Sequence, residues 1–246
     1  MHKILKEILT KTQADIRKFK QSVNTFSKAL TNPKSGSTAI IAEIKLASPT
    51  AKNLGQPAKV KDKAKEYELA GADCISVVVE KHFFHGDPKF IKEIKQTVSL
   101  PVLCKDFIID SYQVYQVKQL GADAILLVAR IVSEKQLVTL VNLAKEIGIE
   151  SVVEINSQGD FEKTLKTNTQ IIAVNARNLD TFEVNIDKAC QLLKIIPNTF
   201  IKLGFSGIIT REDVLKYQKA GVNGVLIGTS LMKTKNIDEY LKGILS

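Results

Sequence analysis

The chain has 246 residues, a length that suits one or two average domains or a single α/β barrel. Hydrophobic residues make up 44% and charged residues 25%, which is the balance of an ordinary globular protein. The net charge of +9 comes from scattered lysines, so we expect some attraction of anionic metabolites. Aromatic residues are only 6% and there is no Trp, which argues against a surface that stacks nucleic-acid bases, and we expect no nucleic-acid partner.

The cysteines and the N-terminal residues bear on the cellular compartment. Cys74, Cys104 and Cys190 are odd in number and widely spaced, which argues against a disulfide framework and a zinc site. The segment Met1–Gln13 lacks the long apolar region of a secretory signal, and no run approaches the roughly 18 apolar residues that span a bilayer. We expect a cytoplasmic protein that binds no metal and no membrane.

Residues 1–38 form an N-terminal extension, in which Met1–Lys20 is predicted as an amphipathic helix. Eight short runs rich in β-branched residues follow. Some, such as Ala124–Ala129, are almost continuously apolar, which is typical of parallel strands buried on both faces. The predicted strands are Ala39–Lys45, Cys74–Glu80, Pro101–Phe107, Asp123–Ala129, Glu150–Ile155, Gln170–Asn175, Thr199–Phe205 and Asn223–Gly228.

Amphipathic helical patterns separate these strands. Ser133 and Thr210 have the character of N-caps, and Gly71, Gly121 and Gly221 suit left-handed helix C-caps before the next strand. The predicted helices are Val60–Ala70, Pro88–Thr97, Ser111–Leu120, Ser133–Ile147, Gln158–Leu165, Asn185–Ile195, Arg211–Ala220 and Ile237–Ile244.

The alternation of eight strands and helices predicts the α/β class and, within it, a (β/α)8 TIM barrel. We expect one domain over residues 1–246, with residues 1–38 as the helical extension, and a monomer. The rival fold is an open doubly wound sheet. That fold usually carries a glycine-rich phosphate fingerprint after an early strand, and neither GxGxxG nor GxxxxGK[ST] is present.

Polar residues at the carboxyl ends of the predicted strands indicate where the chemistry lies, because barrel enzymes place their catalytic groups there. Charges in buried strands are costly unless they are paired or reach a solvated mouth. Side chains two residues apart share a face. The pairs at these strand ends are Glu43 and Lys45, Lys105 and Phe107, Glu154 and Asn156, Asn175 and Arg177, and Phe205 and Gly207.

This mixture of charges favours acid–base chemistry on an anion. A lysine beside a second cation can have its pKa lowered and act as a general acid, and a carboxylate in an apolar mouth can act as a base. After the last two strands, Ser206-Gly207 and Gly228-Thr229 are glycine turns with hydroxyl neighbours. Loops at these positions form the recurrent phosphate site of the barrel fold, so we expect a small phosphorylated substrate.

The motifs resemble those of the indole-3-glycerol-phosphate synthase family, in order from Ile40 to Met232. The resemblance implies a lyase of tryptophan biosynthesis that closes a ring, decarboxylates and dehydrates 1-(2-carboxyphenylamino)-1-deoxyribulose 5-phosphate without a cofactor. The motifs are Ile41-Ala42-Glu43-Ile44-Lys45 with Ala47-Ser48-Pro49, Phe83-Phe84-His85-Gly86, Lys105-Asp106-Phe107-Ile108, Glu154-Ile155-Asn156, Asn175-Ala176-Arg177-Asn178-Leu179, Ser206-Gly207-Ile208 and Ile227-Gly228-Thr229-Ser230-Leu231-Met232.

The same resemblance implies a role for each matching residue. Lys105 would be the general acid and Glu154 the general base, while Lys45 would hold the anthranilate carboxylate and Glu43 would orient Lys45. Asn175 is implied as a catalytic residue that, with Arg177, binds the sugar-phosphate chain. The other implied contacts are Ser48, Phe84, Phe107, Leu179 and Ser206 for the substrate, and Gly207, Gly228 and Thr229 for the phosphate.

The sequence departs from the family pattern mainly at Phe205, where Glu is usual. If the strand is regular, the ring points into the mouth and a carboxylate is lost; alternatively it turns into the core and a neighbouring carboxylate substitutes. A weakly active or non-catalytic relative, including a basic binding protein, is therefore one alternative. Another is a different phosphate-binding barrel, either a sugar-phosphate isomerase or a lyase with a Schiff-base lysine at Lys105.

Overall fold

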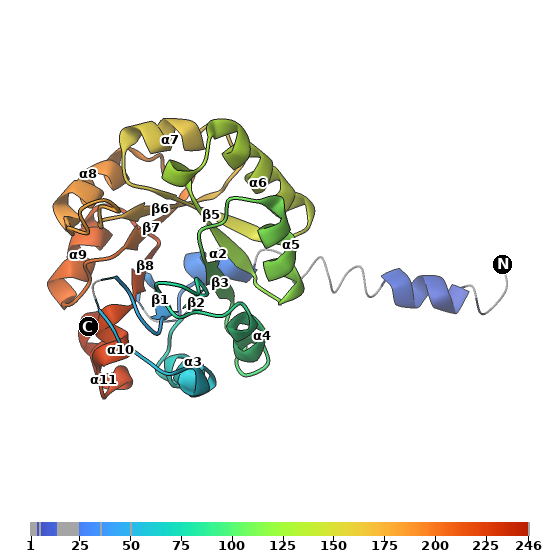
Figure 1. Cartoon of the computed structure of the whole chain (residues 1–246), viewed down its shortest axis with the longest axis horizontal. Coiled ribbons are helices and arrows are strands. Elements are labelled where there is room, and N and C mark those ends of the chain that lie inside the picture. The colour runs from blue at the N-terminus through green and yellow to red at the C-terminus, as the bar shows by residue number, and fades with distance from the viewer. Residues whose placement is uncertain (1–3, 5, 14–24, 35, 50, 246) are drawn as a thin grey trace.

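The computed structural model describes residues 4, 6–13, 25–34, 36–49 and 51–245. Its centre is a closed parallel barrel in which the strands lie in sequential order, so the predicted barrel is confirmed and the open sheet is wrong (Figure 1). Several strands end one or two residues earlier than predicted. The strands are β1 (Ala39–Ile44), β2 (Cys74–Val78), β3 (Val102–Lys105), β4 (Ala124–Val128), β5 (Glu150–Ile155), β6 (Ile171–Asn175), β7 (Ile201–Phe205) and β8 (Gly224–Ile227).

The helices that follow the strands form the outer layer of the barrel (Figure 1). Each predicted helix between or after the strands is present, and the short α10 was not anticipated. They are α3 (Val60–Leu69), α4 (Lys89–Lys95), α5 (Ser111–Gln119), α6 (Glu134–Glu146), α7 (Gln158–Thr164), α8 (Ile186–Ile195), α9 (Arg211–Lys219), α10 (Thr229–Lys233) and α11 (Ile237–Leu245), with 3-10 turns η1 (Pro57–Lys59) and η2 (Ala129–Ile131).

The predicted helix ends are also found. Ser133 caps α6 by accepting a hydrogen bond from the N–H of Gln136, and Thr210 closes a capping box with Asp213 at the start of α9. Glycines 71, 121 and 221 all have positive φ, as a left-handed C-cap requires.

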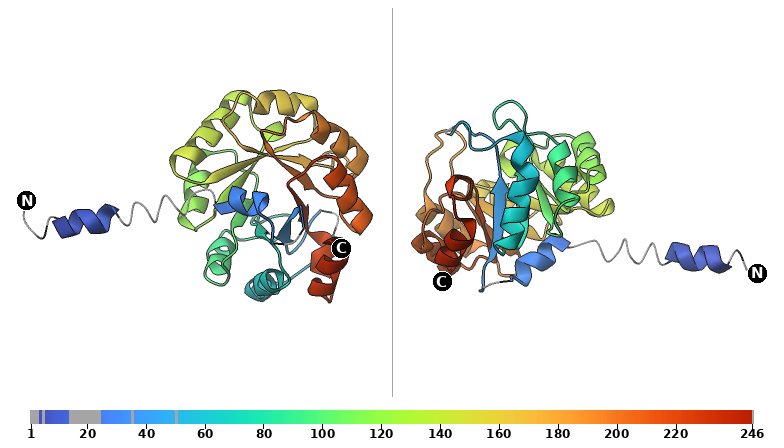
Figure 2. Two further views of the ribbon diagram at one scale, coloured as in Figure 1. Left: turned by 180° about the vertical axis from the view of Figure 1, so that it is seen from behind. Right: turned by 90° about the horizontal axis from the view of Figure 1, so that it is seen from below.

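A short helix in the extension, α2 (Thr25–Thr31), closes the amino-terminal end of the barrel (Figure 2). Its Phe26 and Leu30 are buried against the barrel interior. The carboxylate of Glu150, at the start of β5, accepts hydrogen bonds from the first backbone N–H groups of α2, at 2.9 Å from Phe26. Residues 6–13 are helical, as predicted, whereas residues 14–20 of the same prediction lie outside the described residues.

The strand register stacks the inward side chains in layers, as in other barrels of this type. One apolar layer of alternate strands consists of Ile41, Leu103, Val152 and Leu203. The next layer on these strands lies two residues further toward their carboxyl ends. It consists of Glu43, Lys105, Glu154 and Phe205. The apolar layers fill the barrel, so this upper layer places three ionisable groups at its carboxyl end. Among the described residues, no helix is long and apolar enough to span a membrane.

Candidate active site

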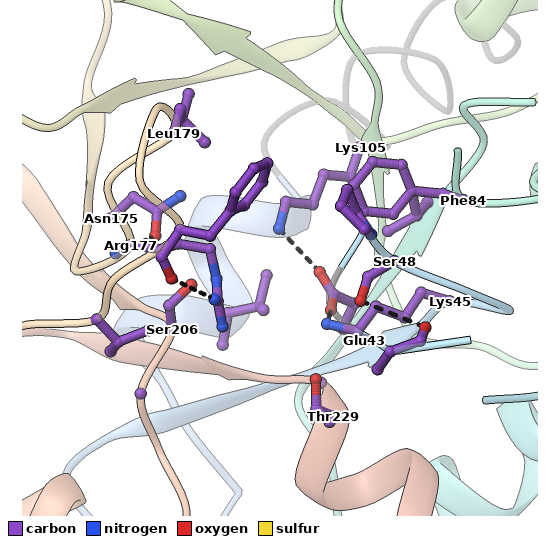
Figure 3. Close-up of a pocket in the computed structure, with 18 of the residues that line it drawn as sticks. Glu43, Lys45, Ser48, Phe84, Lys105, Asn175, Arg177, Leu179, Ser206 and Thr229 are labelled. Atoms are coloured by element: carbon purple, nitrogen blue, oxygen red, sulfur yellow. Dashed lines mark hydrogen bonds and ion pairs between the residues drawn. The ribbon is translucent and has the colours of Figure 1, made fainter. Parts of the chain in front are cut away.

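A cavity of about 1630 Å³ opens at the carboxyl end of the barrel (Figure 3). The strands and the loops after them supply its walls, which is where this fold carries its active sites. Every residue to which the family resemblance gave a role lines this one cavity, although these residues are spread over nearly two hundred positions of sequence. They are Glu43, Lys45, Ser48, Phe84, Lys105, Phe107, Glu154, Asn175, Arg177, Leu179, Ser206, Gly207, Gly228 and Thr229.

The carboxylate of Glu43 bridges two lysines at the floor of the cavity (Figure 3). Its Oε1 lies 2.8 Å from Nζ of Lys105 and its Oε2 lies 2.7 Å from Nζ of Lys45. Only 1% of the Glu43 side chain is exposed, whereas the lysine side chains expose 22% and 15%. The lysines therefore reach the cavity while their positions are fixed from below.

The opposite charges in this trio shift the pKa values of Glu43 and Lys105 in the direction opposite to that expected from burial alone. Burial would raise the pKa of Glu43, but the charges of Lys105 and Lys45 outweigh it and bring the pKa to about 2. Burial would lower the pKa of Lys105, but the carboxylates of Glu43 and Glu154 outweigh it and raise the pKa. The expected lowering of the lysine pKa by a second cation is therefore wrong for Lys105, because a carboxylate lies between the two lysines.

Glu154 has a different environment. Its Oε1 accepts a hydrogen bond from Nδ2 of Asn175 at 3.0 Å, while Oε2 is buried without a hydrogen-bond partner among the described residues. Burial raises the pKa of Glu154, and neither the charge of Lys105 nor the bond from Asn175 cancels that effect. A buried carboxylate with a bare oxygen and a raised pKa is suited to accept a proton, as expected for a general base.

Asn175 is held from both sides, which fixes its contact with Glu154. Its Oδ1 accepts a hydrogen bond from the backbone N–H of Arg177 at 2.9 Å. The Arg177 guanidinium in turn donates to the carbonyl of Phe182 in the loop after β6. The polar end of β6 is thus organised by the loop that follows it.

Phe205 points into the barrel and is fully buried, as regular strand alternation predicted. Its ring centroid lies 5.5 Å from Nζ of Lys105, a cation–π distance. The end of β7 is anchored by the hydroxyl of Tyr217, which donates to the carbonyls of Phe205 and Ser206. Position 205 therefore supplies no carboxylate to the lysines, and the carboxylate that contacts both of them is Glu43.

Aromatic side chains form one wall of the cavity. The rings of Phe84 and Phe107 are tilted by 48° with centroids 6.4 Å apart. The loop that carries Phe84 is held by Glu80, whose carboxylate accepts hydrogen bonds from three successive backbone N–H groups, those of residues 82–84. This wall suits a flat apolar ring.

Glycines that follow β7 and β8 allow close approaches at another part of the cavity wall. Gly207 has φ of +84°, and a Cβ there would lie 2.7 Å from Ile186. A Cβ on Gly228 would lie 2.1 Å from Oε2 of Glu43, so Gly228 makes room for the Glu43–Lys45 pair. The hydroxyl of Ser230 donates to the carbonyl of Ile208, which ties the two loops together.

Sequence reasoning misplaced Asn156 and missed an ion pair. The amide of Asn156 donates to the carbonyls of Asn175 and Arg177 outside the cavity, because β5 ends at Ile155 and its alternation stops there.

Arg130 and Asp180 pair across the mouth, joining the loops after β4 and β6. Arg130 directly follows a predicted strand, so the strand-end rule would have found it. The described residues contain no cluster of His, Cys, Asp and Glu that could hold a metal ion.

Comparisons with known proteins give one consistent result. Residues 2–244 match the family model described as indole-3-glycerol phosphate synthase. A protein of that name from Caldanaerobacter subterraneus subsp. tengcongensis is 40% identical, over 98% of each chain. Another from Alkaliphilus metalliredigens is 41% identical, over 85% of this chain and 80% of that protein.

Solved structures show the same fold at lower identity. A 3-hexulose-6-phosphate synthase from Salmonella typhimurium superposes with a TM-score of 0.66 at 17% identity, over 84% of this chain and 96% of that one. At this level of identity the likeness concerns the fold alone.

Proposed function

This chain belongs to the indole-3-glycerol phosphate synthase family, and we propose that the cavity residues described above carry out the family reaction. The enzyme is a carboxy-lyase of tryptophan biosynthesis. It closes a ring in 1-(2-carboxyphenylamino)-1-deoxyribulose 5-phosphate, releases carbon dioxide and then water, and forms indole-3-glycerol phosphate.

Lys105 acts as the general acid in this proposal and Glu154 as the general base. The ammonium of Lys105 protonates the substrate carbonyl oxygen, or the hydroxyl that departs as water. The carboxylate of Glu154 removes a proton during dehydration. The raised pKa values of Lys105 and Glu154 are compatible with these roles, since the acid is protonated and the base gains affinity for its proton.

Substrate binding follows the charges and shapes of the walls. Lys45, held by Glu43, binds the anthranilate carboxylate, and the rings of Phe84 and Phe107 enclose the aromatic ring. Arg177 and Asn175 bind the sugar-phosphate chain. The remaining contacts are Ser48, Leu179 and Ser206 for the substrate and Gly207, Gly228 and Thr229 for the phosphate.

The observation that carries the proposal is the separation of the acid from the base within one cavity. Lys105 is paired with Glu43, while Glu154 is paired with Asn175 and keeps one oxygen bare. The test is an assay of the purified protein with the anthranilate-derived ribulose phosphate, in which indole fluorescence should appear. Failure of fluorescence to appear, with substrate unconsumed, contradicts the proposal.

The geometry disfavours a Schiff-base lyase. A lysine attacks a carbonyl as the neutral amine, and the carboxylates around Lys105 favour its ammonium form. Borohydride added with substrate should therefore leave no adduct on Lys105. We also propose that the chain acts as a single-domain monomer in the cytoplasm, where its buried free cysteines would stay reduced.

A further inference from the structure

Phe205 belongs to the same layer of inward side chains as the three ionisable groups at the cavity floor. The register places Phe205 across the barrel from Lys105 and between Glu43 and Glu154 around the layer. None of its surface is exposed. The layer thus has two carboxylates at opposite corners, a lysine at the third corner and an aromatic ring at the fourth.

The ring and Glu43 together define the position of the Lys105 ammonium. One N–H group points to Oε1 of Glu43 at 2.8 Å, and Nζ lies over the Phe205 ring at 5.5 Å from its centroid. An ammonium has three N–H donors, and a ring face attracts the charge without accepting a proton. The arrangement leaves N–H capacity directed at the cavity, to which 22% of the Lys105 side chain is exposed.

The apolar ring of Phe205 also bears on the hydrogen bonding of the second carboxylate, Glu154. Residue 205 pairs with Asn175 in the β6–β7 register, and Asn175 holds Oε1 of Glu154. The other oxygen of Glu154, Oε2, is buried and has no hydrogen-bond partner among the described residues, and a phenyl ring at position 205 supplies no donor to it. Lys105 itself is held on Glu43 rather than on Glu154.

We propose that Phe205 is a positioning residue for the general acid: its ring face holds the Lys105 ammonium on Glu43, so that the remaining N–H groups of Lys105 face the substrate and no donor from position 205 occupies Glu154. This inference rests on the proposed function, because it takes Lys105 as the acid. The competing explanation is that Phe205 only fills space, in which case another apolar side chain of similar volume would serve equally well.

The sharpest test replaces Phe205 with phenylalanines carrying one, two and three ring fluorines, which weaken the ring's attraction for a cation while nearly preserving its shape. We expect kcat to fall stepwise with fluorine number while KM changes little. Phe205→Leu, which removes the ring, should lower kcat roughly 3- to 30-fold, the scale of a partly desolvated cation–π contact. The matched control is Phe161→Leu, the same change at a buried position on α7 outside the cavity, which should keep its kcat.

A measurement without substrate separates this inference from the proposed function. In protein labelled with carbon-13 lysine, the Lys105 εCH₂ protons should be displaced upfield by the ring current, and Phe205→Leu should abolish that displacement while Phe161→Leu keeps it. A flat fluorine series, an unshifted Lys105 resonance, or a Phe205→Glu variant with higher kcat/KM would overturn the inference. Full activity of Lys105→Met would instead overturn the acid assignment in the proposed function.

Discussion

Glu43 is the residue on which the charge balance of the cavity depends. It is almost fully buried, yet the two lysines hold its pKa at about 2, so it is ionised at neutral pH. Its charge keeps Lys105 protonated and fixes both ammonium groups. Glu154, with a single amide contact, is the carboxylate left to exchange a proton.

The first prediction concerns the acid and the base. Lys105→Met and Glu154→Gln should each lower kcat by about 10²-fold or more, the scale of general acid–base catalysis, with smaller effects on binding. Because burial raises the pKa of Glu154 above its usual 4.5, kcat/KM in the unmodified enzyme should fall as pH decreases through a value above 4.5. Steady-state kinetics over pH measure both effects, and normal turnover by either variant would remove that residue's role.

The second prediction tests the space that Gly228 leaves for Glu43. A methyl group at this position would lie 2.1 Å from Oε2 of Glu43, so Gly228→Ala must displace the carboxylate from Lys45. Loss of a hydrogen bond to a charged partner corresponds to roughly 10- to 150-fold in kcat/KM if the pair acts mainly in the transition state.

The control for Gly228→Ala is Gly243→Ala on α11, where an added Cβ meets no atom within 4 Å. This control should keep its activity and gain up to about 1 kcal/mol in unfolding free energy, since alanine favours the helix. Equal kinetics for the two glycine variants would mean that the Glu43–Lys45 contact is dispensable.

Strand alternation predicted the ionisable residues at the cavity floor, whereas loop residues such as Ser48, Phe84 and Leu179 came from the family resemblance. The limits of the alternation rule are physical. Glu43, Lys105 and Glu154 follow the period of two because they lie within or at the end of regular strands. Asn156 did not, because it lies one residue past the end of β5. The direction of the Lys105 pKa shift depends on which partner is nearest across the barrel, and a single strand contains no information about that distance.

Among the elements, α2 is one whose position no local pattern indicated. The strands were predicted from their continuous apolar runs and the outer helices from their periodicity and caps. A helix of seven residues shows less than two full periods, and its contacts are with residues about a hundred positions away. Glu150 begins β5 and Asp123 directly precedes β4. Both carboxylates accept hydrogen bonds from the first turn of α2.

The third prediction is that α2 supports stability and not chemistry. Phe26 is fully buried in the barrel interior, so Phe26→Ala should lower the unfolding free energy by roughly 3–5 kcal/mol. The cavity lies at the other end of the strands, so kcat of the folded variant at low temperature should stay close to normal. Denaturant unfolding and kinetics measure the two quantities. Tyr112→Ala, which removes an aromatic ring that is 71% exposed, should change stability by no more than about 0.5 kcal/mol.

At the scale of the whole molecule, the two ends of the barrel have different tasks. The amino-terminal end is covered by α2 (Figure 2), which is hydrogen-bonded to strand residues. The carboxyl end opens into the cavity and carries the ionisable layer. The chain has a net charge of +9, and lysines and arginines line the cavity beside its carboxylates. A phosphorylated anion is therefore attracted both by the overall charge and by the proposed phosphate loops.

These two attractions respond differently to salt, and the last prediction separates them. The long-range part is screened as the Debye length falls from about 10 Å at 0.1 M to about 3 Å at 1 M ionic strength, so sodium chloride should lower kcat/KM more than kcat. Inorganic phosphate at matched ionic strength should compete further with substrate if the backbone at Gly207, Gly228 and Thr229 binds a phosphate group. It should also stabilise the folded chain by about 2.7 kcal/mol at a hundred times its Kd, seen as a higher Tm, whereas chloride should not. If phosphate and chloride have the same effect at equal ionic strength, or if a dephosphorylated substrate binds as tightly as the natural one, the loops after β7 and β8 are not the phosphate site.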